Sequence, residues 1–317
     1  MVLMPRIRLI QLLSITLTSL LLIFCIVTGN KVAFGKTHKH FNAEEKKFLI
    51  QTFKKSGFNE EFLKIIFNNR ALKKSQIVIK KNVINDDRAE FYRSFLSPYS
   101  INIAYRFSKK WRNALRQASN KYQVDQEVLT AILLVETGLG NILGRYGIIN
   151  VFSSILVADY QQDKKNTIDH TLPPEQLHHR ERLRKKANWA HDELEALLLI
   201  SIKTGIDVYS IRGSFAGAFG IPQFLPSSYL KWGIDSDKNG VINLFLFPDA
   251  IHSTANYLKS HGWKKGLYLE SNKDVVWQYN HSQNYVDAVL AVAGKLRQFH
   301  QQKIASFKEK KIRSRTI

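Results

Sequence analysis

Apolar side chains recur at near-helical spacing along most of this chain, and this pattern predicts a mainly α-helical fold. Residues 36 to about 88 are polar, with apolar positions such as Phe48 and Phe53 at helical intervals, so a helical region is expected there. Pro98 interrupts the pattern ahead of a helix expected from about Ile101 to Tyr122. Because no alternating apolar and polar run of any length occurs, at most a small sheet is expected.

The second half of the chain alternates predicted helices with loops. Residues 161–188 are basic, contain histidines and are interrupted by proline, so a long loop or insertion is expected. A helix is expected from about His191 to Lys203, and glycine and proline then cluster from Gly213 to Pro226. Two further helices are expected, one from about Pro248 to His261 and one beginning near Tyr285.

Between these halves lies a short apolar helix that ends in a carboxylate. Asp125 has the character of an N-cap, the apolar run reaches Glu136 or Thr137, and Gly138 stops the helix. The residues three, four and seven positions before Glu136 are all apolar, so its carboxyl group is expected to be poorly solvated. Such surroundings raise the pKa of a carboxyl group and keep it protonated near neutrality, as a general acid requires. The alternative is a glutamate that emerges into water at a helix end.

The N-terminus has the pattern of an export signal. Arg6 and Arg8 precede the stretch from Leu9 to Thr28, which carries no charge and is long enough to span a bilayer if it is not cleaved. Positive charge on one side only favours export over a buried helix. Cys25, the only cysteine, lies inside this stretch, so no disulfide is expected in the exported part.

Charge adds a partner to this picture. Lysine and arginine number 47 against 26 acidic residues, and the net charge is +21. Such an excess indicates a polyanionic partner. For an exported, periplasmic protein the expected partners are peptidoglycan strands and membrane headgroups, with membrane association through residues 9–28 if that segment stays. No nucleic-acid partner is expected, and the protein is expected to be a monomer.

A glycine-rich run from Gly213 to Tyr229 is the second candidate functional segment. Its glycines allow close backbone approach. Ser214 and Gln223 offer hydrogen bonds, and Phe219 and Phe224 offer apolar faces to sugar rings. A tight connection between two helices is the alternative interpretation.

Four motifs in order carry a family resemblance: Val135–Gly138, the Gly213–Tyr229 run, Asn256–Trp263 and Tyr279–Ser282. Together they resemble the family of membrane-bound lytic murein transglycosylase B and its soluble relatives, over residues 41 to 297. The resemblance implies a lysozyme-like (goose-type/transglycosylase) catalytic core with an N-terminal helical region. Only fifteen residues separate Trp263 from Tyr279, where relatives have a longer segment, so the β lobe is expected to be reduced.

In that family the glutamate matching Glu136 is the only catalytic carboxylate. It protonates the oxygen between N-acetylmuramic acid and N-acetylglucosamine, then acts as base while the muramic 6-hydroxyl closes the ring to a 1,6-anhydro end. The substrate's N-acetyl group replaces the usual second carboxylate. No cofactor is required for this chemistry. Two alternatives stay open: a hydrolytic muramidase on the same fold, and a catalytically weak wall-binding or scaffold protein.

The resemblance also implies a set of substrate-binding residues. Lys185 and Lys186 stand where relatives carry two adjacent arginines, so contacts to a carboxylate lose the planar fork of arginine. The residues implied to line the glycan cleft are Tyr92, Lys185, Lys186, Ser214, Gln223, Phe224, Tyr279, Asn280 and Tyr285.

The segment after the glycine-rich run resembles a calcium loop. Asp235, Asp237 and Asn239 take positions 1, 3 and 5, and glycine takes position 6. The carboxylate that closes the longer loop of the family matches Asp249. The expected ligand set for a weak, structural Ca²⁺ or Na⁺ is Asp235, Asp237, Asn239, Val241 and Asp249, with a metal-free turn as the alternative.

These observations divide the chain into four segments. Residues 1–35 are a signal peptide or membrane anchor, 36–88 an N-terminal helical region, and 89–300 the lysozyme-like catalytic domain. Residues 301–317 are a basic C-terminal tail that is expected to fray into solvent.

Overall fold

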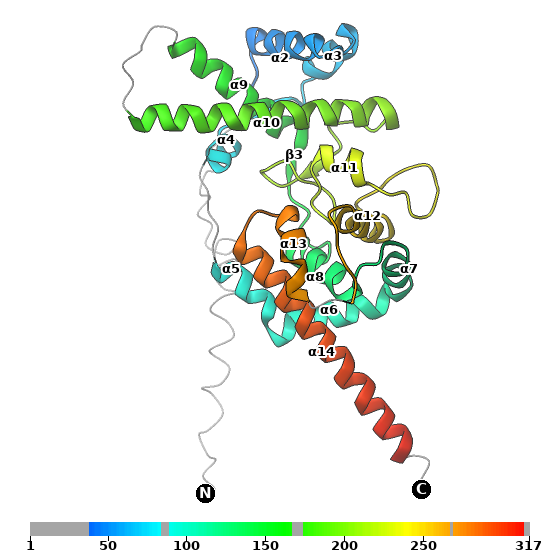
Figure 1. Ribbon diagram of the computed structural model, residues 1–317. Coiled ribbons are helices and arrows are strands. Elements are labelled where there is room, and N and C mark those ends of the chain that lie inside the picture. The colour runs from blue at the N-terminus through cyan, green and yellow to red at the C-terminus, as the bar shows by residue number, and fades with distance from the viewer. Residues whose placement is uncertain (1–37, 84–88, 167–173, 267–268, 314–317) are drawn as a thin grey trace, which may run out of the picture. The chain divides into compact units, whose positions relative to one another are not determined.

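The computed structural model describes residues 38–83, 89–166, 174–266 and 269–313, and it is mainly helical, as predicted (Figure 1). The chain from His38 onward forms one compact unit. Residues 1–35 lie outside the described residues, and the boundaries at 88 and 300 stay predictions. Among the described helices, none has the length and apolar character needed to cross a membrane.

The N-terminal region is helical but also contains a small sheet that the sequence did not reveal. β1 pairs antiparallel with β2, His38 opposite Ser75. Strands of three residues are too short to show an alternating pattern. The elements here are β1 His38–His40, α2 Ala43–Lys55, α3 Glu60–Phe67, β2 Lys73–Ser75 and α4 Gln76–Val83.

The helix expected over 101–122 is two helices. The chain turns at Trp111, whose φ and ψ are −100° and 21°. Pro98 does not precede the helix but begins it, because proline fits the first helical position and Ser97 caps the helix. The elements are α5 Ala89–Arg93, the 3₁₀ turn η1 Ser94–Leu96, α6 Pro98–Lys110 and α7 Arg112–Tyr122.

α8 (Gln126–Thr137) is the buried helix that the sequence predicted. Every residue from Val128 to Val135 is buried, and Gly138 ends the helix in the left-handed conformation. Asp125 occupies the N-cap position, but its side chain does not cap. Its carboxylate instead accepts hydrogen bonds from Trp263 Nε1 at 3.0 Å and from Arg297 at 2.9 Å, which ties α8 to the C-terminal half of the chain.

The loop expected over 161–188 is wrong for residues 161–166 and 174–188, which are helical, and residues 167–173 lie outside the described residues. α9 (Ile148–Asn166) and α10 (Pro174–Thr204) pack against each other, and α10 is one long helix (Figure 1). Pro174 stands at the start of α10, where proline is tolerated. Arg184 of α10 pairs with Asp159 of α9 at 2.7 Å, so an ion pair holds the polar part of the two helices together.

The remaining elements confirm the reduced β lobe. The described residues between Trp263 and Tyr279 form turns, a 3₁₀ turn and a helix. The final helix continues to Arg313. The tail expected to fray from residue 301 is therefore helical up to Arg313. The elements are β3 Tyr146–Gly147, β4 Arg212–Gly213, α11 Pro226–Trp232, α12 Phe247–Ser260, η2 Leu269–Asn272, α13 Lys273–Tyr279 and α14 Gln283–Arg313.

Candidate active site

Glu136 lies at the end of α8 and is hydrogen-bonded from α14. The phenol of Tyr285 donates to Glu136 Oε1 at 2.7 Å. Tyr285 is only 1% exposed, and its backbone N–H donates to Ser282 Oγ at 3.1 Å in the first turn of α14. The position of the phenol is therefore fixed by both packing and a helix cap.

Burial raises the pKa of Glu136 to about 7, and the hydrogen bond from Tyr285 partly opposes this shift. The direction agrees with the one expected from the apolar face of α8. Glu136 nevertheless keeps part of its surface open to solvent. A carboxyl group with this pKa is substantially protonated at neutral pH, and its partial exposure leaves room for contact with a substrate.

Tyrosine rings form one wall beside this carboxyl group. The rings of Tyr279 and Tyr285 lie nearly parallel with centroids 6.3 Å apart, and Tyr92 meets Tyr285 edge-on at 6.3 Å. Tyr279 donates its phenol to Pro222 O at 2.7 Å. Burial raises the pKa of Tyr279 and Tyr285 well above the ordinary value, so both phenols stay protonated donors. The structure therefore brings Tyr92, Tyr279 and Tyr285 together around Glu136.

Phe219 and Phe224 do not offer faces to sugar rings, and this expectation is wrong for the conformation described. They are 3% and 2% exposed, respectively. Phe224 packs against Tyr279 with centroids 6.1 Å apart, beneath the tyrosine wall. An apolar ring in a glycine-rich segment is buried here because the segment folds over the core.

The glycine-rich segment satisfies most of its own polar groups. Ser214 Oγ accepts the N–H of Ala218 at 3.2 Å, and no hydrogen bond joins Ser214 to Glu136 in the described chain. Gln223 adopts a left-handed φ of 51°, and its amide donates to Gly220 O and Leu143 O. These side chains therefore stabilise the shape of the segment.

Thr137, the residue after the candidate acid, was not singled out by the sequence. Its hydroxyl donates to Ile221 O at 3.0 Å and accepts the N–H of Gly140 at 3.0 Å. This contact ties the end of α8 to the glycine-rich segment. Ser282 was also missed as a support for Tyr285, although a serine just before a predicted helix is a recognisable cap signal.

For three predicted cleft residues, the contacts described here are with residues other than Glu136 and the three tyrosines. Asn280 is half-buried at the end of α13, and its N–H donates to Val276 O. Lys185 is exposed on α10, and the ammonium of Lys186 lies 4.8 Å from the centre of the Trp189 ring. Their roles in substrate binding stay predictions.

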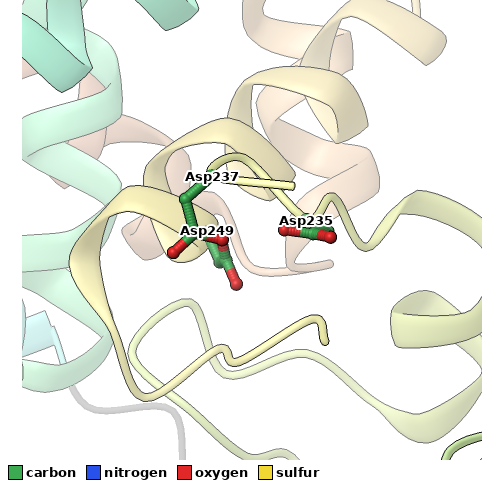
Figure 2. Close-up of side chains that lie close together, drawn as sticks. All are labelled: Asp235, Asp237 and Asp249. Carbon is green, nitrogen blue, oxygen red and sulfur yellow. The ribbon is translucent and has the colours of Figure 1, made fainter. Parts of the chain in front are cut away.

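The calcium-like loop gathers three carboxylates around one point (Figure 2). Ligand oxygens of Asp235, Asp237 and Asp249 all lie within 4.8 Å of one another. Asp249 is buried, and it also accepts the N–H groups of Ser236 at 2.9 Å and Asn243 at 2.7 Å. Hard oxygen ligands at this spacing fit Ca²⁺ or Na⁺.

The other two expected ligands, Asn239 and Val241, are hydrogen-bonded to each other. Asn239 uses its amide within the loop, donating to Asp237 at 3.0 Å and accepting the N–H of Val241 at 2.8 Å. Gly240 has a φ of 91°, which suits the sharp turn at position six. The loop therefore has the shape of the predicted site, with three carboxylates as its clear ligand groups.

Comparison with known proteins places this geometry in a family. Residues 40–270 match the family described as "Transglycosylase SLT domain". The chain belongs to this family. It is 28% identical over 236 residues to membrane-bound lytic murein transglycosylase B of Escherichia coli K12, covering 71% of this chain and 59% of that protein. The chain thus spans less than two thirds of the length of that relative.

Solved structures of lytic transglycosylases share the fold. Soluble lytic transglycosylase SltB1 of Pseudomonas aeruginosa matches with a TM-score of 0.65 and 24% identity, over 81% of this chain and 99% of that one. Escherichia coli Slt35 in complex with calcium matches with a TM-score of 0.63 and 21% identity, over 84% and 97%. P. aeruginosa SltB3 in complex with NAG-NAM-pentapeptide matches with a TM-score of 0.65 and 18% identity, over 80% of this chain and 79% of that one. The predicted lysozyme-like, mainly α fold is confirmed.

Proposed function

We propose that this member of the transglycosylase SLT family is a peptidoglycan lytic transglycosylase. The observation that carries the proposal is a single carboxyl group, Glu136, whose pKa burial raises to about 7 and which accepts a hydrogen bond from a buried tyrosine. A carboxyl group that is substantially protonated at neutral pH can supply the acid step of the one-carboxylate reaction that the family resemblance implies.

The reaction proceeds in two proton transfers at one group. Protonated Glu136 gives its proton to the oxygen between N-acetylmuramic acid and N-acetylglucosamine, and the bond from that oxygen to the anomeric carbon breaks. The Glu136 carboxylate then takes the proton of the muramic 6-hydroxyl as its oxygen bonds to the anomeric carbon. Glu136 ends protonated, so no cofactor is consumed. Exclusion of water beside the tyrosine wall favours ring closure over hydrolysis.

The remaining cleft residues have supporting roles in this proposal. The phenol of Tyr285 holds Glu136 in place, and Tyr92 and Tyr279 offer aromatic surface to the glycan. Ser214 and Gln223 shape the glycine-rich segment, and Asn280, Lys185 and Lys186 provide further contacts to the substrate. Phe224 acts through Tyr279, on which it packs.

The mass of the soluble products tests this function. Incubating purified residues 36–317 with isolated peptidoglycan is expected to release fragments with 1,6-anhydro ends. Fragments heavier by one water would instead identify a hydrolytic muramidase. Binding to the wall without any soluble fragment would contradict an enzymatic role and favour a scaffold protein.

We further propose that the Asp235–Asp249 loop binds a structural Ca²⁺ or Na⁺. The support is the carboxylate cluster, and the relative Slt35 was solved in complex with calcium. Ca²⁺ added after chelation is expected to raise the melting temperature by about 2–6 °C, because a ligand that binds only the folded state stabilises it. Asp237→Asn should abolish the shift, while Asp274→Asn on α13 should keep it. No shift with either ion would indicate a metal-free turn.

Export to the periplasm is the proposed location, with residues 9–28 as a cleaved signal or a retained anchor. The support is the one-sided charge around that segment and the membrane-bound relative in E. coli. N-terminal sequencing of the protein recovered from separated membrane and periplasmic fractions distinguishes an anchor from a signal peptide. Recovery from the cytoplasm alone would contradict export.

A further inference from the structure

Three cations surround the turn that carries Ser214: Arg145, Arg212 and Lys81, here called the basic rim. We infer that the basic rim binds free carboxylates on the peptide stem of the substrate, and so makes the protein selective for stem-bearing glycan. This inference rests on the proposed function. It assigns to the substrate site three residues that the sequence patterns did not single out.

Arg145 and Arg212 are held side by side by the β3–β4 ribbon. Gly147 pairs with Arg212 across the ribbon, and the guanidinium of Arg212 donates to the backbone carbonyl of Arg145 at 3.1 Å. Just before Arg145, a Cβ built on Gly144 would lie 2.1 Å from the backbone of Gly213. The two chain segments are therefore in direct backbone contact, and the backbone positions of the two arginines lie close together.

Lys81 reaches the same turn from α4. Its ammonium lies 5.1 Å from the centre of the Phe215 ring, which is 38% exposed. The neighbouring Asn82 donates its side-chain amide to Phe215 O at 2.8 Å, and this hydrogen bond fixes α4 against the turn. A third cation is thus placed beside the Ser214 turn by an element distant in sequence.

The charges of the basic rim have no acidic partner in the part of the chain that the structure describes. All three side chains are exposed, and none lies within ion-pair distance of a described carboxylate. Some cations elsewhere are paired, as Arg184 is with Asp159 and Arg297 with Asp125. An anionic ligand is attracted by each cation that has no acidic partner.

The segments that carry the rim and the catalytic group are joined by hydrogen bonds from side chains to backbone carbonyls. Gln223 donates to Leu143 O, two residues before Arg145, and Thr137 beside Glu136 donates to Ile221 O. These links support the assignment of the rim to the substrate that reaches Glu136. A glycan with peptide stems fits, because each stem carries free carboxylates close to the muramic ring, and guanidinium groups recognise carboxylates in a planar, two-point contact. The relative SltB3 was solved with such a peptide-bearing sugar.

Kinetics on two substrates test the inference. The substrates are stem-bearing peptidoglycan and the same glycan after an amidase has removed the stems, which leaves only the lactyl carboxylate. Arg145→Gln/Arg212→Gln, with and without Lys81→Gln, should raise KM about 10-fold on the stem-bearing glycan and change kcat less than about two-fold. On stripped glycan KM should change little. The matched control for the double variant, Lys109→Gln/Arg116→Gln on α6 and α7, also removes two charges from exposed positions and should leave both KM values unchanged.

Two results would overturn the inference. An equal rise in KM on both substrates would mean that the rim binds the lactyl carboxylate or the glycan itself. An equal rise in KM for the control variant would mean that the effect comes from net charge and not from the rim. Co-sedimentation of the variants with the two substrates gives the same comparison without turnover. A wild type that binds peptidoglycan but releases no anhydro fragments would contradict the proposed function. The co-sedimentation of the variants with the two substrates would still test the rim.

Discussion

Glu136→Gln is expected to lower the rate of anhydro-product formation by about 10³-fold or more while wall binding persists. Glutamine keeps the shape of the side chain and can still accept the hydrogen bond from Tyr285, but it has no proton to give to the glycosidic oxygen. General acid–base catalysis contributes about 10²–10⁴-fold, and here one group supplies both the acid and the base. The measurement is the initial rate of release of anhydro fragments, identified by mass.

The pH dependence of the wild type follows from the same group. Because the pKa of Glu136 is about 7, the protonated form that begins the reaction is lost as the pH rises through this value. Activity is therefore expected to fall above about pH 7. Full activity of Glu136→Gln, or a wild-type rate that keeps rising to pH 9, would contradict the role of Glu136 as the acid.

The stability of the variant separates lost chemistry from a lost fold. The folded-state pKa of Glu136 lies above its ordinary value of 4.5, so the folded protein holds this proton more tightly than the unfolded chain. That stabilisation is present below about pH 4.5 and is lost as the pH rises through about 7. Glutamine carries no charge at any pH, so Glu136→Gln should be at least as stable as the wild type at pH 8. A lower melting temperature at pH 8 would indicate that the variant is damaged.

The sequence predicted those parts of the site that depend on local pattern. The buried helix α8, its glycine stop and the raised pKa of Glu136 all follow from apolar residues next to one another in the chain. The family resemblance added Tyr279 and Tyr285. The contact between Tyr285 and Glu136 spans 149 residues, and no local spacing predicts the 2.7 Å hydrogen bond.

Two errors have physical causes that the structure makes clear. Phe224 was expected at a sugar face, yet burial depends on how the whole glycine-rich segment folds over the core. The first half of α10 was expected to be a loop because the segment around it is basic, contains histidines and is interrupted by proline. Its buried positions Leu183, Ala187 and Ala190 do have helical spacing, but two of them are alanines, which give a weak apolar signal.

Gly144→Ala is expected to destabilise the protein by about 3 kcal/mol or more, because two independent effects oppose any side chain at this position. Gly144 has a φ of 86°, which L side chains rarely adopt, and its new Cβ would lie 2.1 Å from the backbone of Gly213. Neither backbone segment is free to move, since Gly213 is itself paired with Tyr146 and a Cβ there would meet Ala218 O at 2.0 Å. The substitution therefore forces apart the two segments that shape the cleft.

Gly262→Ala is the matched control for this prediction. Gly262 has a similar φ of 92°, but nothing lies within 4 Å of a Cβ built there. Gly262→Ala should lower the free energy of unfolding only by the strain of the left-handed backbone, about 1–2 kcal/mol. Melting temperatures of the two variants measure the difference, which should be about 2 °C or more for a chain of this size. Equal losses would mean that the backbone around Gly144 yields at little cost, and that the close approach of residues 144 and 213 does not hold the cleft in shape.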